Sequence, residues 1–562
     1  MHDLQDTDIK LSTFYMEHYF STLEQTIKRN WDQPALCNYQ GESFSFRQMA
    51  ENIEKFHIFF NEIGLKKGDK VALSAKNTAR WANTFLAINT YETVVVPILS
   101  DFTPEAISHL THHSEAKVLF TDKDLWQKMD IKDMPNVKAV IDNADYTLLY
   151  SFDESVNNAF SSINEKFNNK FPLGFSRENV CYPKDNQKDL SIINYTSGTT
   201  SAPKGVMLRY ECFSAMVDYA IRNVYVDDND SIVSMLPMGH IYGLAFEFIY
   251  PLCNGCTINY LGKTPSPTLL LKAMKDVKPY MVCTVPLVME KVYKSSIKPV
   301  ISKWYMKVLL AIPGIGGIIY KKIGEKLNEA FGGKVRHFIM GGAALNPEVE
   351  KVFRKIKLRY TVGYGMTEAS PLLAYADASV YAPGSCGRPV DCAEVKIDSE
   401  DPQHIAGEIL AKGLNICSGY FNNPEASANA FTEDGYLRTG DLGIMDKNNN
   451  IFIKGRCKTM ILSANGQNIY PEELEAVINN QNYVAESVVV DRAGSLIALV
   501  YLDADAIKKD RLDQETVSDI PEQIRHNVNR VFPKYSQISK VELVVAPFEK
   551  TPKMSIKRFL YK

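Results

Sequence analysis

Strand-like and helix-like segments alternate along much of this chain, and this alternation restricts its fold more than any other feature. Residues 43–64 carry apolar side chains at a spacing of about 3.6 and end in Gly64, which is typical of an amphipathic helix with a glycine cap. Residues 70–75 form a short apolar run, and helix, turn and strand patterns follow over residues 80–99. The alternation resumes over residues 190–345. It predicts an α/β fold with layered, largely parallel sheets covered by helices.

Two later regions have a different character. Residues 385–455 hold short β-rich runs separated by glycine turns, which indicates an antiparallel or β-barrel-like subdomain. A compact α+β pattern begins after Lys458. We therefore expect a large N-terminal domain over residues 1–457 and a small α+β C-terminal domain over residues 458–562, joined by a hinge. The polar stretch at residues 145–187 is expected to be an irregular surface segment.

Composition narrows the classes of function. The 562 residues include 63 basic and 66 acidic side chains, a net charge of -3, so the average surface does not attract nucleic acid or an anionic membrane. No apolar run reaches the roughly 20 residues of a spanning helix, and the polar N-terminus does not resemble a signal peptide. The ten cysteines form no regular framework, and Cys253 and Cys256 are interpreted as a structural thiol pair. These features favour a cytoplasmic protein. Its oligomeric state is not predicted.

The sharpest motif is the loop from Tyr195 to Gly205, YTSGTTSAPKG, which follows a predicted strand. Its glycines Gly198 and Gly205 allow backbone amides to approach an anion closely. Hydroxyl side chains add donors, and Lys204 adds a positive charge. The loop is therefore expected to bind a polyphosphate. It is not a Walker A loop, because the GxxxxGK[ST] order is absent.

This loop resembles the phosphate loop of the acyl-adenylate-forming (AMP-binding) superfamily, TSG[ST]TGxPKG, except that Ser201 stands where Gly is usual. Further family motifs follow in the expected order, and within the superfamily the chain looks most like long-chain fatty acyl-CoA synthetases. These motifs are LPMGHIYGL around His240, GGAAL from Gly341, YGMTE from Tyr364, TGD ending at Asp441, KGRCK ending at Lys458, and the segment from Asn465 to Glu473.

The resemblance implies roles for individual residues. The nucleotide would contact Thr196, Ser197, Gly198, Thr199, Thr200, Gly342, Ala343, Tyr364, Gly365, Asp441 and Arg456. Catalysis would use Lys204, Thr367, Glu368 and Lys553, with Mg²⁺ held at Thr200 and Glu368. His240 and Gly341 would line the acyl site, and Lys458 would be the hinge pivot. The residue types suit these roles, because phosphate-bound Mg²⁺ takes a carboxylate, adenine an aromatic face and ribose a carboxylate acceptor.

The implied activity is ATP-dependent ligation of a carboxylic acid to CoA through acyl-AMP, with ATP, Mg²⁺ and CoA as small-molecule partners. A medium- or long-chain fatty acid is the expected acid, because Asn77, Trp81 and residues 93–97, 285–293 and 331–342 look like the long-chain enzymes. Its tail would need an apolar tunnel, expected near residues 242–248. Two further interpretations stay open: an acyl carrier protein as acceptor, or a non-catalytic nucleotide- or acyl-binding protein.

The C-terminal frame departs from the family pattern. The family has a lysine that reaches the α-phosphate, and the aligned position here holds Ser555, which offers no cation. Three interpretations stay open: Lys553 substitutes for the lysine, the position was altered in this chain, or adenylation is weak.

Residues 304–322 also allow two interpretations. Their apolar side chains are flanked by lysines, which suits peripheral contact with a membrane surface. The same pattern suits a buried helical hairpin.

Overall fold

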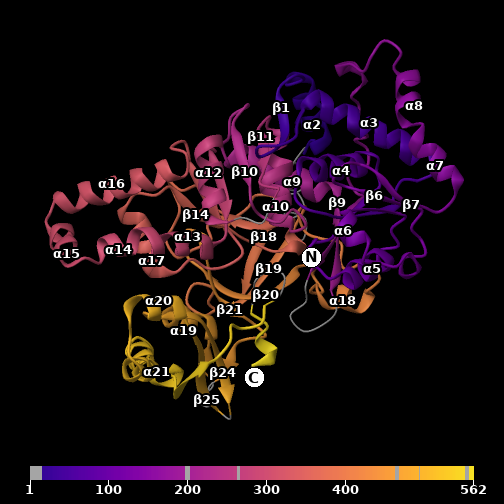
Figure 1. Ribbon diagram of the computed structural model, residues 1–562. Helices are drawn as coiled ribbons and strands as arrows, with labels where there is room; N and C mark the ends of the chain where they lie inside the picture. The colour runs from indigo at the N-terminus through magenta and orange to yellow at the C-terminus, as the bar shows by residue number, and fades with distance from the viewer. Residues whose placement is uncertain are drawn as a thin grey trace, which may run out of the picture.

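The computed structural model describes residues 16–196, 203–262, 266–462, 467–492, 494–550 and 556–561. Two seven-stranded sheets form the centre of the large N-terminal part, and a smaller α+β part lies at its lower side (Figure 1). The predicted α/β fold with layered, parallel-rich sheets is confirmed.

The first sheet has the order β7-β6-β5-β3-β4-β8-β9, and its neighbours run parallel except at the two edge pairs. Its edge pair β8 and β9 carries the two ends of the predicted phosphate loop. The strands are β3 (Lys70–Ser74), β4 (Val94–Pro97), β5 (Val118–Thr121), β6 (Ala139–Asp142), β7 (Leu148–Ser151), β8 (Leu190–Thr196) and β9 (Lys204–Arg209).

The second sheet has the order β14-β13-β12-β10-β11-β1-β2 and is parallel except for the pair β1 and β2. The carboxyl ends of β10 and β13 lead directly into the predicted acyl segments. The strands are β1 (Pro34–Asn38), β2 (Ser43–Ser45), β10 (Ser231–Ser234), β11 (Thr257–Tyr260), β12 (Met281–Thr284), β13 (His337–Met340) and β14 (Tyr360–Val362).

Helix α4 (Ala79–Thr90) connects the two sheets, because it contacts β1 on one side and β3 and β4 on the other. Its polar side chains are buried but hydrogen-bonded. Asn83 Nδ2 donates to the Met49 carbonyl at 3.1 Å, and Asn89 Nδ2 donates to Ser191 Oγ at 2.9 Å. Most of the buried polar groups of α4 therefore have partners within the protein, although Asn83 Oδ1 has none among the described residues.

The expected helix at residues 43–64 is α3 (Phe46–Glu62), which Ser45 and Gln48 start with a capping box. The other helices of the N-terminal part cover the sheets or project from them. They are α2 (Tyr19–Arg29), α5 (Pro104–His113), α6 (Lys123–Trp126), α9 (Tyr210–Asn223), α10 (Ile241–Gly243), α11 (Tyr250–Cys253), α12 (Pro267–Val277), α13 (Pro286–Val292), α14 (Lys298–Ile301), α15 (Trp304–Ala311), α16 (Ile315–Ala330) and α17 (Pro347–Lys355).

The polar stretch at residues 145–187 lies at the surface, but it is more regular than expected. It forms α7 (Glu154–Ser161) and α8 (Ile163–Lys170) near the edge of the molecule (Figure 1). In α7, Val156 and Ala159 are buried three residues apart on one face, and in α8 the ring of Phe167 is buried, so each helix has an apolar contact with the rest of the protein.

The β-rich region is antiparallel, as expected. Its main sheet has the order β18-β19-β20-β21 and is open, with β18 and β21 at its edges, rather than closed into a barrel. A small sheet of β15, β16 and β17 precedes it. The elements are β15 (Tyr364–Gly365), β16 (Leu372–Tyr375), β17 (Arg388–Pro389), β18 (Ala393–Asp398), β19 (Gly407–Gly413), α18 (Pro424–Asn429), β20 (Leu437–Met445) and β21 (Ile451–Arg456).

The C-terminal part is the expected small α+β unit and has its own apolar cluster. Among the helices described, none is long and apolar enough to cross a membrane. The elements are β22 (Ile461–Leu462), β23 (Asn468–Ile469), α19 (Pro471–Ile478), β24 (Val484–Arg492), β25 (Ser495–Leu502), α20 (Ala504–Asp510), α21 (Gln514–Asn529) and β26 (Lys540–Val544).

An ion pair between the half-buried Arg558 and the buried Glu475 fastens residues 556–561 to α19. Arg558 donates from Nη1 to Glu475 Oε1 at 2.6 Å and from Nη2 to the other carboxylate oxygen. Burial raises the pKa of Glu475 to about 7, and the guanidinium of Arg558 opposes that shift. The pair therefore holds a carboxylate that would be costly to bury alone.

We expect Arg558→Ala to lower the free energy of unfolding of the C-terminal part by about 3 kcal/mol, because it leaves Glu475 buried without its cation. Hydrogen exchange of the α19 amides, measured at increasing urea concentration, reports the change in the free energy of unfolding. The control is Arg525→Ala, which removes an exposed pair with Glu522 and should change little. Equal effects from the two variants would contradict a special role for the Arg558–Glu475 pair.

A second buried carboxylate supports the segment that leads to His240. Glu247 lies in a π-helix (Leu244–Ile249), and its Oε2 accepts from Ser234 Oγ at 3.0 Å and from the amides of Met235 and Leu236 at 3.0 and 2.8 Å. Its Oε1 has no partner among the described residues. Burial raises the pKa of Glu247 to about 8, so the group is a neutral acid at neutral pH.

This raised pKa makes stability depend on pH. The contribution of Glu247 is fully present below its unfolded pKa of 4.5 and is lost as pH rises through about 8. We expect the free energy of unfolding to fall by about 1.4 kcal/mol per pH unit from this group within that window. Glu247→Gln should remove this slope in urea titrations at pH 5.5, 6.5 and 7.5. The exposed Glu400→Gln is the control, and an unchanged slope in Glu247→Gln would refute the assignment.

Candidate active site

Strands β8 and β9 bring two predicted site residues together. Thr196, the last residue of β8, is the cross-strand partner of Lys204, the first residue of β9. The outer edge of β9 is covered by residues 418–421, since the Met207 amide donates to the Gly419 carbonyl at 3.0 Å and the Phe421 amide to the Gly205 carbonyl at 2.8 Å. This pairing places the Tyr420 ring 5.0 Å from Lys204 Nζ.

Tyr420 also links the lysine to the predicted metal ligand. Its hydroxyl donates to Glu368 Oε1 at 3.0 Å, and the neighbouring Cys417 amide donates to the Glu368 carbonyl at 2.8 Å. Burial and the nearby Glu368 carboxylate raise the pKa of Tyr420, so its hydroxyl keeps its proton. Lys204 and Glu368 are therefore held on two sides of one aromatic side chain, whose role the sequence did not predict.

A second cluster is formed by the predicted nucleoside-binding residues. The Tyr364 hydroxyl donates to Asp441 Oδ2 at 2.8 Å, and Arg456 Nε lies 3.0 Å from Asp441 Oδ1. Asp441 and Arg456 are cross-strand partners in β20 and β21. Burial raises the pKa of Asp441, while Arg456 and the hydrogen bond from Tyr364 oppose the shift.

The YGMTE motif is constrained by close backbone contacts. A Cβ added at Gly365 would lie 1.8 Å from the Pro371 carbonyl oxygen, so only glycine fits there. Thr367 and Glu368 follow in a short buried 3₁₀ turn. The motif therefore joins the Tyr364–Asp441 cluster to the Glu368–Tyr420 cluster through five consecutive residues.

The predicted acyl segments also meet. A Cβ at Gly341 would touch the Tyr242 ring at 3.3 Å, and the Tyr242 hydroxyl donates to the Ile339 carbonyl at 3.0 Å. His240 precedes α10, and the carbonyl of its neighbour Gly239 accepts from Asn194 Nδ2 of β8 at 2.9 Å. The acyl segment is thereby tied to the strand that precedes the phosphate loop. Gly342 and Ala343 are exposed immediately after this contact.

Asn77 holds the acyl segment from its other side. Its side-chain Nδ2 donates to the Leu236 carbonyl at 2.9 Å, and its Oδ1 accepts from the backbone amide of Met238 at 3.2 Å. Glu247 binds the same segment through the amides of Met235 and Leu236. Of the residues expected near a tunnel, Tyr242 is half-buried, and Gly243 and Leu244–Phe248 are buried.

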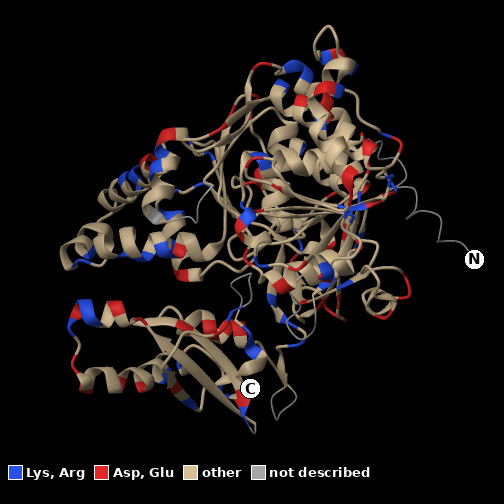
Figure 2. Ribbon diagram, turned by 45° about the vertical axis from the view of Figure 1, so that its right-hand side comes forward, with Lys and Arg blue, Asp and Glu red and all other residues tan. Residues whose placement is uncertain are grey.

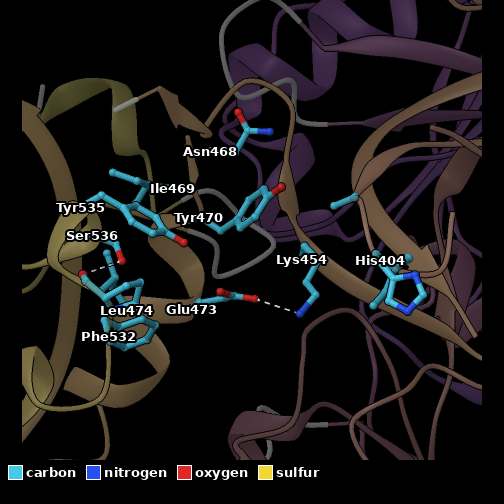
Figure 3. Close-up of a pocket in the computed structure, with 13 residues that line it drawn as sticks. His404, Lys454, Asn468, Ile469, Tyr470, Glu473, Leu474, Phe532, Tyr535 and Ser536 are labelled. Carbon is cyan, nitrogen blue, oxygen red and sulfur yellow. Dashed lines mark hydrogen bonds and ion pairs between the residues drawn. The ribbon is translucent and has the colours of Figure 1, made fainter. Parts of the chain in front are cut away.

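The proposed hinge adjoins a cleft between the antiparallel sheet and the C-terminal part. The cleft holds a cavity of about 270 Å³. His404 and Lys454 line it on one side, and Tyr470 and Tyr535 on the other (Figure 3). Lys454 Nζ lies 3.3 Å from Glu473 Oε1 across it. Lys458 itself is exposed just after β21. The cleft is thus bridged by a half-exposed ion pair rather than by a continuous apolar core.

Several predicted site residues lie outside the residues that the structure describes. They belong to the phosphate loop after Thr196 and to the C-terminal frame. They are Ser197, Gly198, Thr199, Thr200, Lys553 and Ser555. Among the residues that the structure does describe, no cluster of three or more His, Cys, Asp or Glu side chains could hold a metal by itself.

The chain has clear relatives. Residues 23–421 match the family model of the AMP-binding enzymes, and residues 458–561 match that of the AMP-binding enzyme C-terminal domain. Long-chain-fatty-acid–CoA ligase 1 of Saccharomyces cerevisiae is 27% identical over 508 residues, which cover 83% of this chain and 72% of that protein. 4-Coumarate–CoA ligase 1 of Petroselinum crispum is 28% identical over 488 residues, which cover 83% and 80%.

A solved structure has the same fold. ATP-bound MatB from Rhodopseudomonas palustris superposes with a TM-score of 0.76 at 22% identity, over 97% of this chain and 98% of that chain. The motif resemblance is therefore confirmed by sequence and by fold, and this chain belongs to the AMP-binding enzyme family.

Proposed function

We propose that this chain is an ATP-dependent acyl-CoA ligase that activates a carboxylic acid through acyl-AMP. The observation that carries the proposal is the Lys204–Tyr420–Glu368 arrangement at the end of β8 and β9, joined through the YGMTE motif to Tyr364 and Asp441. One cluster offers a cation and a carboxylate for polyphosphate, and the other offers an aromatic ring and a carboxylate for the nucleoside. Family membership supports reading these clusters as the two ends of an ATP site.

The reaction proposed has two steps at one site. A carboxylate oxygen attacks the α-phosphorus of ATP, and the bond to pyrophosphate breaks. The CoA sulfur then attacks the acyl carbon, AMP leaves, and the thiol proton is released. Lys204 stabilises negative charge on the phosphates, and Asp441 accepts hydrogen bonds from the ribose hydroxyls. His240 and Gly341 border the acid, close to the strand that carries the phosphate loop.

Mg²⁺ fits this site as a phosphate-bound ion. The described residues offer it one carboxylate, Glu368, with the hydroxyl of Thr200 as a second ligand expected from the sequence. Such a sparse set suits Mg²⁺, which keeps waters and phosphate oxygens as its other ligands. When bound, the ion would neutralise charge on the phosphates, and Tyr420 would fix the orientation of the carboxylate that holds it.

We further propose a medium- or long-chain fatty acid as substrate, CoA as acceptor and a cytoplasmic location. Similarity to a long-chain-fatty-acid–CoA ligase supports the fatty acid as substrate. Similarity to a 4-coumarate–CoA ligase makes aryl acids the competing substrate class. The motifs are also compatible with an acyl carrier protein as acceptor, or with a binding protein that has no turnover. Peripheral contact with a membrane is also proposed, through residues 304–322.

The first test is pyrophosphate release with Mg-ATP, CoA and a panel of C2 to C18 acids together with 4-coumarate. We expect CoA-dependent turnover that favours the longer fatty acids. Preference for 4-coumarate would move the substrate to aryl acids, and turnover only with acyl carrier protein would change the acceptor. The proposal of a ligase fails if the folded protein binds ATP but releases no pyrophosphate with any acid.

The missing lysine is tested in the same assay. We propose that Lys553 supplies the cation in place of Ser555, and expect Lys553→Ala to lower the rate about a hundredfold. The control Lys557→Ala removes a lysine that lies 3.4 Å from Glu549 and should be nearly neutral. If Lys553→Ala is neutral while Ser555→Lys greatly raises the rate, the chain lacks an adenylating cation.

Tyr420→Phe tests the link between the lysine and the carboxylate. It keeps the ring against Lys204 but removes the hydrogen bond to Glu368, which is worth about 1.5 kcal/mol for a charged acceptor. We expect roughly tenfold lower turnover and a higher Mg²⁺ concentration at half-maximal rate. Tyr483→Phe, which loses a similar hydroxyl bond to the exposed Asp510, is the control. An unchanged Mg²⁺ requirement would show that Tyr420 does not orient the metal ligand.

A further inference from the structure

Helices α15 and α16 form an arm that projects from the N-terminal part. Figure 1 shows α15 at the left-hand end of the molecule, joined to α16 by residues 312–314. The nearby apolar cluster includes Ile301 and Tyr320 at its margin, so the residues between them extend beyond that cluster. All eight residues of α15 are exposed or half-exposed. The expectation of a buried hairpin is therefore right about the shape but wrong about burial.

Several strongly exposed side chains of the arm are large and apolar. Trp304 is 79% exposed, Val308 57% and Ile318 60%. Tyr305, Ile312 and Ile315 are exposed beside them. Leaving so many large apolar groups in water is unfavourable, and their grouping on one arm is typical of an interaction surface.

The two helices of the arm pack directly against each other. A Cβ added at Gly316 would lie 2.4 Å from the Leu310 carbonyl oxygen, so the two helices touch closely at this glycine. Gly314 has a φ of +82°, which lets the chain turn between them. The apolar side chains are therefore presented by two packed helices.

Charge distinguishes among the possible partners. Residues 303–322 contain four lysines and no acidic residue, whereas the whole chain has a net charge of -3. The acidic residues of the arm, Glu325 and Glu329, lie in the second half of α16, where Lys321 Nζ is 3.8 Å from Glu325 Oε1. In Figure 2 blue segments recur along the same arm. A symmetric contact with a second copy would place lysines of one arm near lysines of the other, which is repulsive. An anionic lipid surface suits both features of the arm. The tryptophan and isoleucines can insert toward the acyl chains, and the lysines can bind the lipid phosphates.

We propose that the α15–α16 arm docks onto an anionic lipid bilayer, with Trp304, Val308 and Ile318 inserted at the level of the headgroups. Lys303, Lys307, Lys321 and Lys322 contact lipid phosphates around them. The docking itself is independent of catalysis. That the bilayer supplies a lipid-soluble acid to the active site rests on the proposed function.

The experiment uses the full chain and vesicles of phosphatidylcholine with about 30% phosphatidylglycerol, against phosphatidylcholine alone. Sedimentation measures binding, and tryptophan emission with brominated lipid measures insertion. Of the four tryptophans, Trp31 and Trp81 are buried and Trp126 is half-buried, whereas Trp304 is 79% exposed, so Trp304 should dominate a blue shift and its quenching, and Trp304→Phe should remove both. We expect binding that needs the anionic lipid and weakens with salt.

Two variants separate the contributions. Val308→Ser with Ile318→Ser should weaken vesicle binding at least about tenfold, and Lys303→Glu with Lys307→Glu should abolish the preference for anionic lipid. Leu173→Ser with Val545→Ser, at fully exposed apolar positions elsewhere, should bind like the parent. Circular dichroism and turnover of a short, water-soluble acid check the fold of each variant.

The outcomes are distinct from those of the ligase assay. No binding to anionic vesicles by the folded parent would overturn the proposal, and so would unchanged binding in both arm variants. A dimer in solution that the apolar variants dissociate would assign the arm to self-association instead. Vesicle binding without any turnover would support the proposal of membrane docking and contradict the proposal of ligase activity.

Discussion

Antiparallel pairing between β9 and residues 418–421 is the interaction on which the proposed ATP site depends. These segments are about two hundred residues apart in sequence, and their backbone hydrogen bonds cover the open edge of the first sheet. The same pairing brings Tyr420 over Lys204 and within reach of Glu368. A requirement of sheet architecture thus also sets the distance between a cation and a carboxylate that would act on the same phosphates.

Three buried carboxylates show how the surroundings of an acid determine its state. Asp441 has a guanidinium and a phenol as partners, and Glu475 has a guanidinium. Glu247 receives only neutral donors at one oxygen, and the titratable side chains near it, Tyr242, Tyr260 and Cys283, are themselves buried with raised pKa values. Asp441 and Glu475 are each paired with a cationic guanidinium. Glu247, with neutral donors alone, is suited to holding the backbone amides that precede the acyl segment.

Local patterns predicted the fold well, because they reflect local physics. Helix α3 follows from apolar spacing and a capping box at Ser45, and the motif residues Tyr364 and Asp441 do meet. Tyr420 was missed because its partners lie far away in sequence, and no spacing around it signals them. The helices at residues 154–170 were missed because Val156, Ala159 and Phe167 are few among polar neighbours. Contacts with distant parts of the chain therefore decided both cases: side-chain partners for Tyr420 and burial for the two helices.

The arm at α15 and α16 shows where sequence reasoning stops and why. Apolar residues flanked by lysines suit both a buried hairpin and a membrane surface, since the pattern does not say what covers them. Exposure of Trp304 and Val308 separates the two interpretations. A net charge of -3 describes the average surface, and the field near a bilayer acts only within about 8 Å at physiological salt. Residues 303–322 contain four lysines and no acidic residue, although Lys321 Nζ lies 3.8 Å from Glu325 Oε1 in the next turn of α16, so the local charge there is positive while the remaining chain is not.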